Sequence, residues 1–100
     1  MIKHIVIWRL KENAHGNTKT QNASIIKSRV EALSGKIPGI LKLEIGFDFS
    51  KTGNSGDIVL YSEFASKEHF ESYRIHPEHR AVLPFVQEAV SDRLVVDYQM

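Results

Sequence analysis

The chain starts with an apolar segment in which hydrophobic side chains occupy both alternating sets of positions. One set comprises Ile2, Val6, Trp8 and Leu10, and the other comprises Ile5 and Ile7. Apolar residues at both parities, many of them β-branched or aromatic, are typical of a strand that is covered on both faces. The pattern therefore predicts a central strand over Ile2–Leu10.

A second pattern, with apolar residues at steps of three and four, follows a polar stretch. Its members are Ala23, Ile26, Val30, Leu33 and Ile37. Thr18 and Gln21 precede it at the spacing of a capping box, in which each side chain bonds to the backbone N–H of the other residue. Together these residues predict an amphipathic helix that begins at Thr18 and ends near Gly35.

Two more strands are predicted on either side of a polar loop. After the turn at Pro38-Gly39, apolar residues alternate with polar ones over 41–49, as in a strand with one buried face. The loop Ser50–Gly56 is rich in turn-forming residues and leads to Asp57–Phe64, where apolar residues again occupy both parities. We therefore expect a hairpin whose second strand is central.

The remaining chain predicts two helical segments and a final strand. Ser66 can cap a short helix, which must stop near Ile75 because Pro77 disfavours helical backbone at the residue before it. Pro77 then starts a second helical segment, in which Pro84 removes one backbone hydrogen bond and should kink or split the helix. The final strand has alternating apolar residues at Leu94, Val96 and Tyr98.

The element order β-α-β-β-α-β predicts an α+β, ferredoxin-like fold for residues 1–100 as a single domain. In this fold the first and third strands are central, the second and fourth lie at the edges, and helices cover one face of the antiparallel sheet. The other face would expose apolar side chains to water, which we assign to Ile5, Ile7, Val59, Tyr61 and Val95. Because such a patch needs a cover, the sequence predicts a homodimer through the open sheet face.

Composition narrows the range of partners. A net charge of +1 and the lack of a basic stripe argue against nucleic acid. The longest apolar run, Ile5–Trp8, is too short to span a membrane, and no signal-peptide pattern is present. The absence of cysteine excludes disulfides and thiolate chemistry and suits a reducing compartment. We therefore expect a cytoplasmic protein that binds a small molecule or a second copy of itself.

Four segments in order resemble the stress-responsive A/B barrel family, also called Dabb, over the whole chain. They are KHIVIWRLK (residues 3–11), PGILKLEIG (38–46), DIVLYSEFAS (57–66) and YRIHPEH (73–79). The resemblance implies a homodimer in which two sheets pack face to face into a dimeric α/β barrel. It also implies a pocket in each subunit between the sheet and the helices.

Within this family, the chain has a distant similarity to plant olivetolic acid cyclase. That enzyme needs no cofactor and closes a polyketide chain by an aldol condensation, using histidines and a tyrosine. The similarity places its first-strand histidine on His4, its tyrosine on Tyr73 and its helical histidine on His79. A further pocket histidine of the cyclase falls on Ile58, which implies a drier pocket with fewer polar groups.

The three polar residues suit proton transfer if they meet. His4 shares the parity of Val6, so its ring should face the helices, where a buried imidazole needs a hydrogen-bond partner. Tyr73 and His79 are six residues apart, and the break at Pro77 can turn the chain so that both reach one cavity. Imidazole can take a proton from an acidic carbon, and a phenol can donate to the developing enolate oxygen. The alternative is structural: His4 and Tyr73 fill the core, and His79 anchors the start of a helix.

Two functions remain open on these grounds. The first is binding of a small apolar or aromatic compound, without a cofactor, in a pocket lined by His4, Trp8, Ile58, Tyr73 and His79. The second is a cofactor-independent, cyclase-like or lyase-like enzyme that acts on a carbonyl compound. In that enzyme His79 is the general base, and Tyr73 and His4 orient the substrate or stabilise an oxyanion. Antibiotic-biosynthesis monooxygenases and haem-degrading enzymes share the barrel architecture but not these motifs, so they offer only an analogy.

A metal site is not expected. His76 and His79 have a spacing that could place two ligands on one helical face. No cysteine or carboxylate can be placed beside them, and His76 is expected to end the first helical segment before Pro77.

Overall fold

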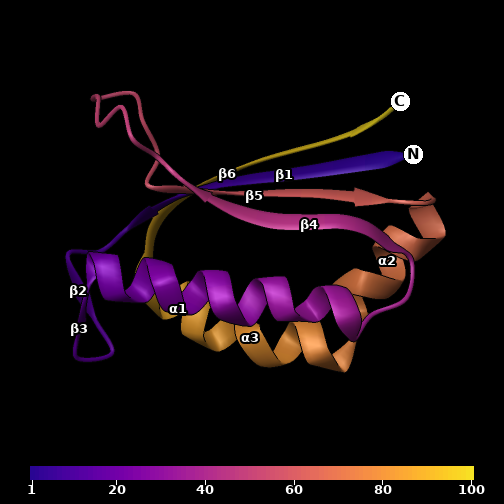
Figure 1. Cartoon of the computed structure of the whole chain (residues 1–100), viewed down its shortest axis with the longest axis horizontal. Coiled ribbons are helices and arrows are strands. Elements are labelled where there is room, and N and C mark those ends of the chain that lie inside the picture. Colours follow the sequence, from indigo (N-terminus) through magenta and orange to yellow (C-terminus); the bar gives the residue numbers. More distant parts are fainter.

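The computed structural model describes residues 1–100 as a four-stranded antiparallel sheet with the helices on one face (Figure 1). The strands of this sheet are β1 (Ile2–Leu10), β4 (Ile40–Phe47), β5 (Ile58–Phe64) and β6 (Val90–Gln99). The helices are α1 (Lys19–Glu31), the 3-10 segment η1 (Ala32–Gly35), α2 (Lys67–Ile75) and α3 (Pro77–Ala89). The strand order β4-β5-β1-β6 confirms the ferredoxin-like fold and its two central strands.

The capping box predicted at the start of α1 is present. The Thr18 hydroxyl accepts from the Gln21 N–H at 3.3 Å, and the Gln21 side-chain oxygen accepts from the Thr18 N–H at 2.9 Å. The helix then buries Ile26 and Val30 against the sheet, and η1 carries the chain on to Gly35. The predicted start of this helix is therefore confirmed, whereas the α-helix ends at Glu31 and a 3-10 segment covers the last four residues to Gly35.

A short hairpin between β1 and α1 was not expected from the sequence. It consists of β2 (Asn13–Ala14) and β3 (Asn17–Thr18), and His15 and Gly16 form its tip with positive φ angles. The His15 ring stacks on Phe85 of α3 with the ring centroids 4.0 Å apart. Its Nε2 donates to the Phe85 carbonyl at 2.9 Å, which joins the hairpin to the end of α3.

The open face of the sheet is apolar, as expected, but one residue was assigned to the wrong side. In the β1–β6 register, Val95 pairs with Val6, whose side chain faces the helices. Val96 pairs instead with Ile5 on the open face and is 58% exposed. The more apolar set of β6, which comprises Leu94, Val96 and Tyr98, faces the open side of the sheet, and the set with Arg93 and Asp97 faces the helices. The prediction failed because only the pairing with β1 decides which side chains face inward.

The alternating pattern of β4 is buried over a shorter length than predicted. Leu43 and Ile45 are buried, whereas Phe47 is half exposed and Phe49, beyond the strand, is 92% exposed. A register shift between Ile40 and Lys42 also leaves Leu41 outside the regular pairing, where it is 57% exposed. The helices cover only the middle of this edge strand.

The two C-terminal helices are separated at the predicted place. Ile75 ends α2, and His76 has an extended backbone before Pro77 begins α3. The helix α3 then continues through Pro84 to Ala89, so Pro84 does not split it. The break at His76 lets α2 and α3 pack on the sheet in different directions (Figure 1).

Candidate functional site

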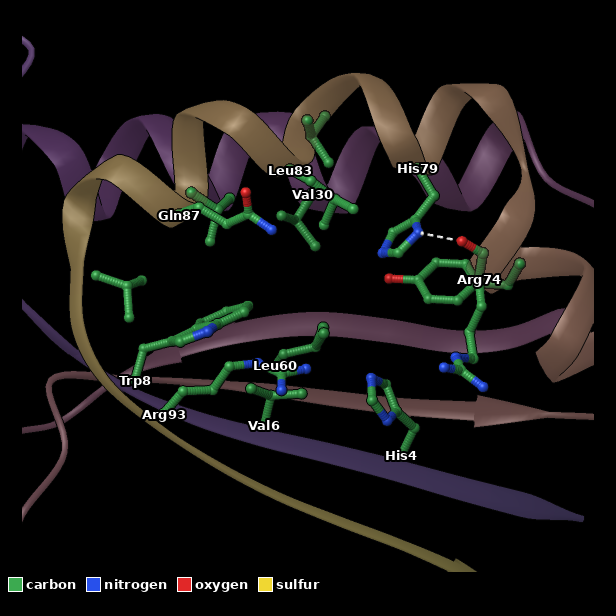
Figure 2. A pocket seen from close by; sticks show the side chains of 14 residues that line it. His4, Val6, Trp8, Val30, Leu60, Arg74, His79, Leu83, Gln87 and Arg93 are labelled. Carbon is green, nitrogen blue, oxygen red and sulfur yellow. Dashed lines mark hydrogen bonds between the residues drawn. The ribbon is translucent and has the colours of Figure 1, made fainter.

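A cavity of about 470 Å³ lies between the helix-covered face of the sheet and the helices. Nine of its fourteen lining residues are hydrophobic. The sheet wall is formed by Val6, Trp8 and Leu60, and the helix wall includes Val30, Val82 and Val86. Figure 2 shows these two walls with polar side chains between them. The cavity is therefore a mostly apolar space with a few polar groups that could fix the orientation of a ligand.

His4 lies in the sheet wall on β1 and is 8% exposed. Its Nδ1 is hydrogen-bonded to a carboxylate oxygen of Asp97, which is its register partner on β6. An ionised carboxylate can only accept, so Nδ1 carries the proton and the opposite nitrogen, Nε2, is the one left without a partner in the protein. The His4 ring also packs against Phe70 and Tyr73, with centroid distances of 4.9 and 6.4 Å.

Tyr73 comes from the last turn of α2 and is only 2% exposed. Burial raises the pKa of Tyr73 to about 12, so its phenol stays protonated at neutral pH and can donate. The hydroxyl has no hydrogen-bond partner in the protein, yet no fully enclosed side-chain polar atom is unpaired. The hydroxyl is therefore reached through the cavity that Tyr73 lines.

His79 lies in the first turn of α3 and is half buried against Tyr73, with ring centroids 4.3 Å apart. Its Nδ1 donates to the backbone carbonyl of Arg74 at 3.0 Å (Figure 2). Burial lowers the pKa of His79, and this hydrogen bond opposes the shift while the nearby charges of His4 and Arg74 add to it. The neutral ring at pH 7 therefore presents Nε2 with a free lone pair.

The break between the helices explains how residues six apart meet. His76 caps α3, because its Nδ1 accepts from the backbone N–H of Glu78 at 3.1 Å. The chain turns at this cap, and His79 folds back over the end of α2 to reach Arg74 and Tyr73. The structure thus brings Tyr73, His79 and His4 to one cavity, with no direct hydrogen bond between them.

Of the two other residues predicted to line the pocket, the structure places one in the cavity wall and one outside it. Trp8 lines the cavity and is 7% exposed. Ile58 is buried at 3% exposure but is not among the lining residues, because the next inward-facing residue of β5, Leu60, forms that wall. The predicted face of Ile58 was correct, whereas its side chain belongs to the buried core and not to the cavity wall, although its register partner Trp8 does line the cavity.

Sequence reasoning missed the polar groups Asp97, Arg74, Gln87 and Arg93. Arg74, Gln87 and Arg93 line the cavity, and Asp97 orients His4. Arg93 and Asp97 share the parity of Val95 in the last strand, so assigning Val95 to the inner face would have found both. The structure contains no group of three or more histidine, cysteine or carboxylate side chains that could hold a metal ion.

Comparison with known proteins identifies relatives over nearly the whole chain. The sequence profile of the stress responsive A/B barrel domain matches residues 2–100. A dimeric protein of unknown function with a ferredoxin-like fold from Bacteroides fragilis is 34% identical, with a TM-score of 0.86 and coverage of 99% of this chain and 95% of that one. No curated protein matches the sequence significantly.

More distant structures share the fold. A Dabb family protein from Mesorhizobium loti is 24% identical, with a TM-score of 0.73 and coverage of 99% and 95% of the two chains. The hydroxynitrile lyase of Passiflora edulis is 20% identical, with a TM-score of 0.78 and coverage of 99% and 92%.

None of the helices in the present structure is long and apolar enough to cross a membrane.

Proposed function

This chain belongs to the stress-responsive A/B barrel family, and we propose that it acts as a homodimer whose subunits each bind a small apolar or aromatic compound. The cavity between sheet and helices carries this proposal. Its volume of about 470 Å³ lies in the range of small-molecule sites, and its walls are mostly apolar. A cytoplasmic location, supported by the cysteine-free composition, is part of the same proposal.

The open face of the sheet supports the homodimer. It exposes apolar side chains on β1 and β6, namely Ile7, Leu94, Val96 and Tyr98, at 40%, 68%, 58% and 40%. A patch of this kind is typically covered by a partner, and the Bacteroides fragilis relative is dimeric. Two copies packed through these faces would form the barrel.

Trp8 provides a direct test of ligand binding, because it is the only tryptophan and it lines the cavity. We expect the neutral aromatic compounds p-cresol and 3-phenylpropanol to change its fluorescence with a saturable dependence on concentration. Val86→Phe should weaken this binding by at least about tenfold, because a larger side chain occupies the space between the walls. Leu41→Phe, at an exposed position outside the cavity, is the matched control. Unchanged binding in Val86→Phe would contradict the proposed site.

A second candidate function is supported by the hydrogen bond between His79 and Arg74. Because this bond occupies Nδ1, the Nε2 atom of neutral His79 is available to remove a proton from carbon next to a carbonyl group. The protonated phenol of Tyr73, which packs against His79, would donate to the enolate oxygen, and His4 would hold the carbonyl end. The hydroxynitrile lyase shares only the fold, so this candidate depends on the geometry alone.

Hydrogen exchange at carbon tests this second function without knowledge of the substrate. Phenylacetone is incubated with the protein in D2O, and deuterium incorporation next to its carbonyl is followed by NMR. A catalytic base predicts exchange above the buffer rate that His79→Ala abolishes while the fluorescence-detected affinity changes little. If phenylacetone binds but neither protein accelerates the exchange, the ligand-binding function is retained and His79 is excluded as a base for this ketone.

A further inference from the structure

The charges that line the cavity have one sign. No aspartate or glutamate is among the fourteen lining residues, whereas Arg74 and Arg93 both are. Arg74 is paired with Glu71, since its Nη1 contacts both carboxylate oxygens at 3.1 and 3.3 Å. Arg93 differs, because its guanidinium makes no ion pair or hydrogen bond in the subunit. Arg93 is exposed to solvent, and it is the lining arginine whose charge no protein group balances.

The Arg93 side chain is directed toward the space that a ligand would occupy. Arg93 pairs with Trp8 in the β1–β6 register, so its side chain leaves the sheet on the helix-covered face. Figure 2 shows it reaching along the sheet wall toward His4 rather than out of the cavity. On the opposite wall, the amide of Gln87 points into the same space and also has no partner in the protein (Figure 2). Two unpaired donors, one from β6 and one from α3, thus face the same cavity from opposite walls (Figure 2).

We propose that the ligand of this cavity is a carboxylic acid with an aromatic ring or short acyl chain, whose carboxylate binds to Arg93 with support from Gln87. This inference rests on the proposed ligand-binding function and adds the chemical class. The planar guanidinium matches a carboxylate through two parallel hydrogen bonds, and such charge-assisted bonds are stronger than neutral ones. The apolar walls formed by Val6, Leu60 and Val86 would hold the hydrocarbon part.

The orientation of the ligand follows from the two ends of the cavity. Trp8, the register partner of Arg93, lies four positions along β1 from His4, which corresponds to about 13 Å between their backbone positions. The Arg93 side chain reaches over part of this distance (Figure 2). With its carboxylate on Arg93, the ligand directs its other end toward Tyr73 and His79. The charged group and any reacting group are therefore at opposite ends of the bound molecule. This arrangement places a carbonyl near His79 only if a ring or chain separates it from the carboxylate.

Matched acids and amides test the assignment by Trp8 fluorescence titration. The probes are 3-phenylpropionate and octanoate, each compared with its neutral amide of nearly the same shape. The parent protein should bind each acid about tenfold or more tightly than its amide, as expected for loss of a charge-assisted pair. Arg93→Gln should remove most of this preference, because it should weaken acid binding far more than amide binding. Arg80→Gln, which removes the same charge from a helix position outside the cavity, should retain it.

The outcomes separate the two proposals. Acids and amides that bind equally well to the parent would overturn the carboxylate assignment and leave ligand binding intact. A preference that survives in Arg93→Gln but disappears in Arg74→Gln would also overturn it, because the anchor would then be Arg74. If neither the acids nor the amides bind, and the neutral probes p-cresol and 3-phenylpropanol also fail, the proposed function falls and this inference falls with it. Unchanged circular dichroism and melting temperature of Arg93→Gln show that the variant is folded.

Discussion

The carboxylate of Asp97 on β6 accepts a hydrogen bond from Nδ1 of His4 on β1, although the two residues are 93 positions apart in the sequence. The two strands are neighbours in the sheet, and the register pairs these residues directly. The bond orients the His4 ring and leaves Nε2 on the opposite side of the imidazole. Asp97 is thus a positioning residue for the polar end of the cavity.

Removing this carboxylate should destabilise the protein. Asp97→Ala leaves Nδ1 of the buried His4 ring without its partner, and we expect a loss of about 1–3 kcal/mol in the free energy of unfolding. Urea denaturation measures this loss. Asp92→Ala, an exposed position on the same strand, is the control and should cost less. Equal losses in both variants would show that the His4–Asp97 bond contributes nothing specific.

The buried position of His79 predicts a pH dependence of stability. Burial lowers the pKa of His79 in the folded protein below its unfolded value, which is about 6.5. The unfolded chain therefore binds the proton first, so the contribution of His79 to stability is present above about pH 6.5 and is lost as pH falls toward the folded pKa. We expect the free energy of unfolding to decrease between pH 7 and pH 5.

The variant His79→Gln should show a weaker decrease over the same range, measured by urea denaturation at several pH values. The chain has four other histidines, so the comparison with the parent isolates the contribution of this one. The same slope in both proteins would mean that His79 has similar proton affinity in the folded and unfolded states.

Two variants of Tyr73 should distinguish the contribution of its ring to packing from the contribution of its hydroxyl group. Tyr73→Phe keeps an aromatic ring in contact with Phe64 and His79 and removes only a hydroxyl that has no protein partner. We expect a change in stability below about 1 kcal/mol, whereas Tyr73→Ala should cost about 3–5 kcal/mol because it empties a fully buried site. Thermal and urea unfolding measure both. A large loss in Tyr73→Phe would instead reveal a structural role for the hydroxyl.

Two neighbouring valines test the assignment of the sheet faces. Val96→Asp places a charge on the open face, so the subunit should remain folded while the dimer dissociates. Val59→Asp, which lies opposite Ile7 on that face, should act in the same way. Val95→Asp places the charge against the core beneath the helices and should destabilise the subunit itself.

Light scattering reports the mass and circular dichroism reports the fold of each variant. Ser24→Asp, at an exposed position on α1, controls for added charge and should remain dimeric. A parent protein with the mass of one subunit at micromolar concentration would refute the homodimer.

Local patterns were sufficient for the types and order of the main elements. The capping box at Thr18 and the break at Pro77 act over a few residues, so they could be read directly and were confirmed. The small hairpin that contains His15 gave no such signal, because two-residue strands have no periodicity to detect. The continuity of α3 through Pro84 also depends on its surroundings, since one missing backbone bond can be offset by packing.

The candidate site shows where the sequence was insufficient by itself. Parity placed His4 on the helix side of β1, and the proline break allowed Tyr73 and His79 to converge, so these residues could be proposed in advance. Arg93 and Asp97 could not, because their set of positions in β6 is mostly polar and only the pairing with β1 places it on the helix-covered face. The free energy of that pairing comes from contacts between residues about 90 positions apart, which no local periodicity records. Sequence thus determined the elements and their order, and the tertiary register decided which charged groups enter the cavity.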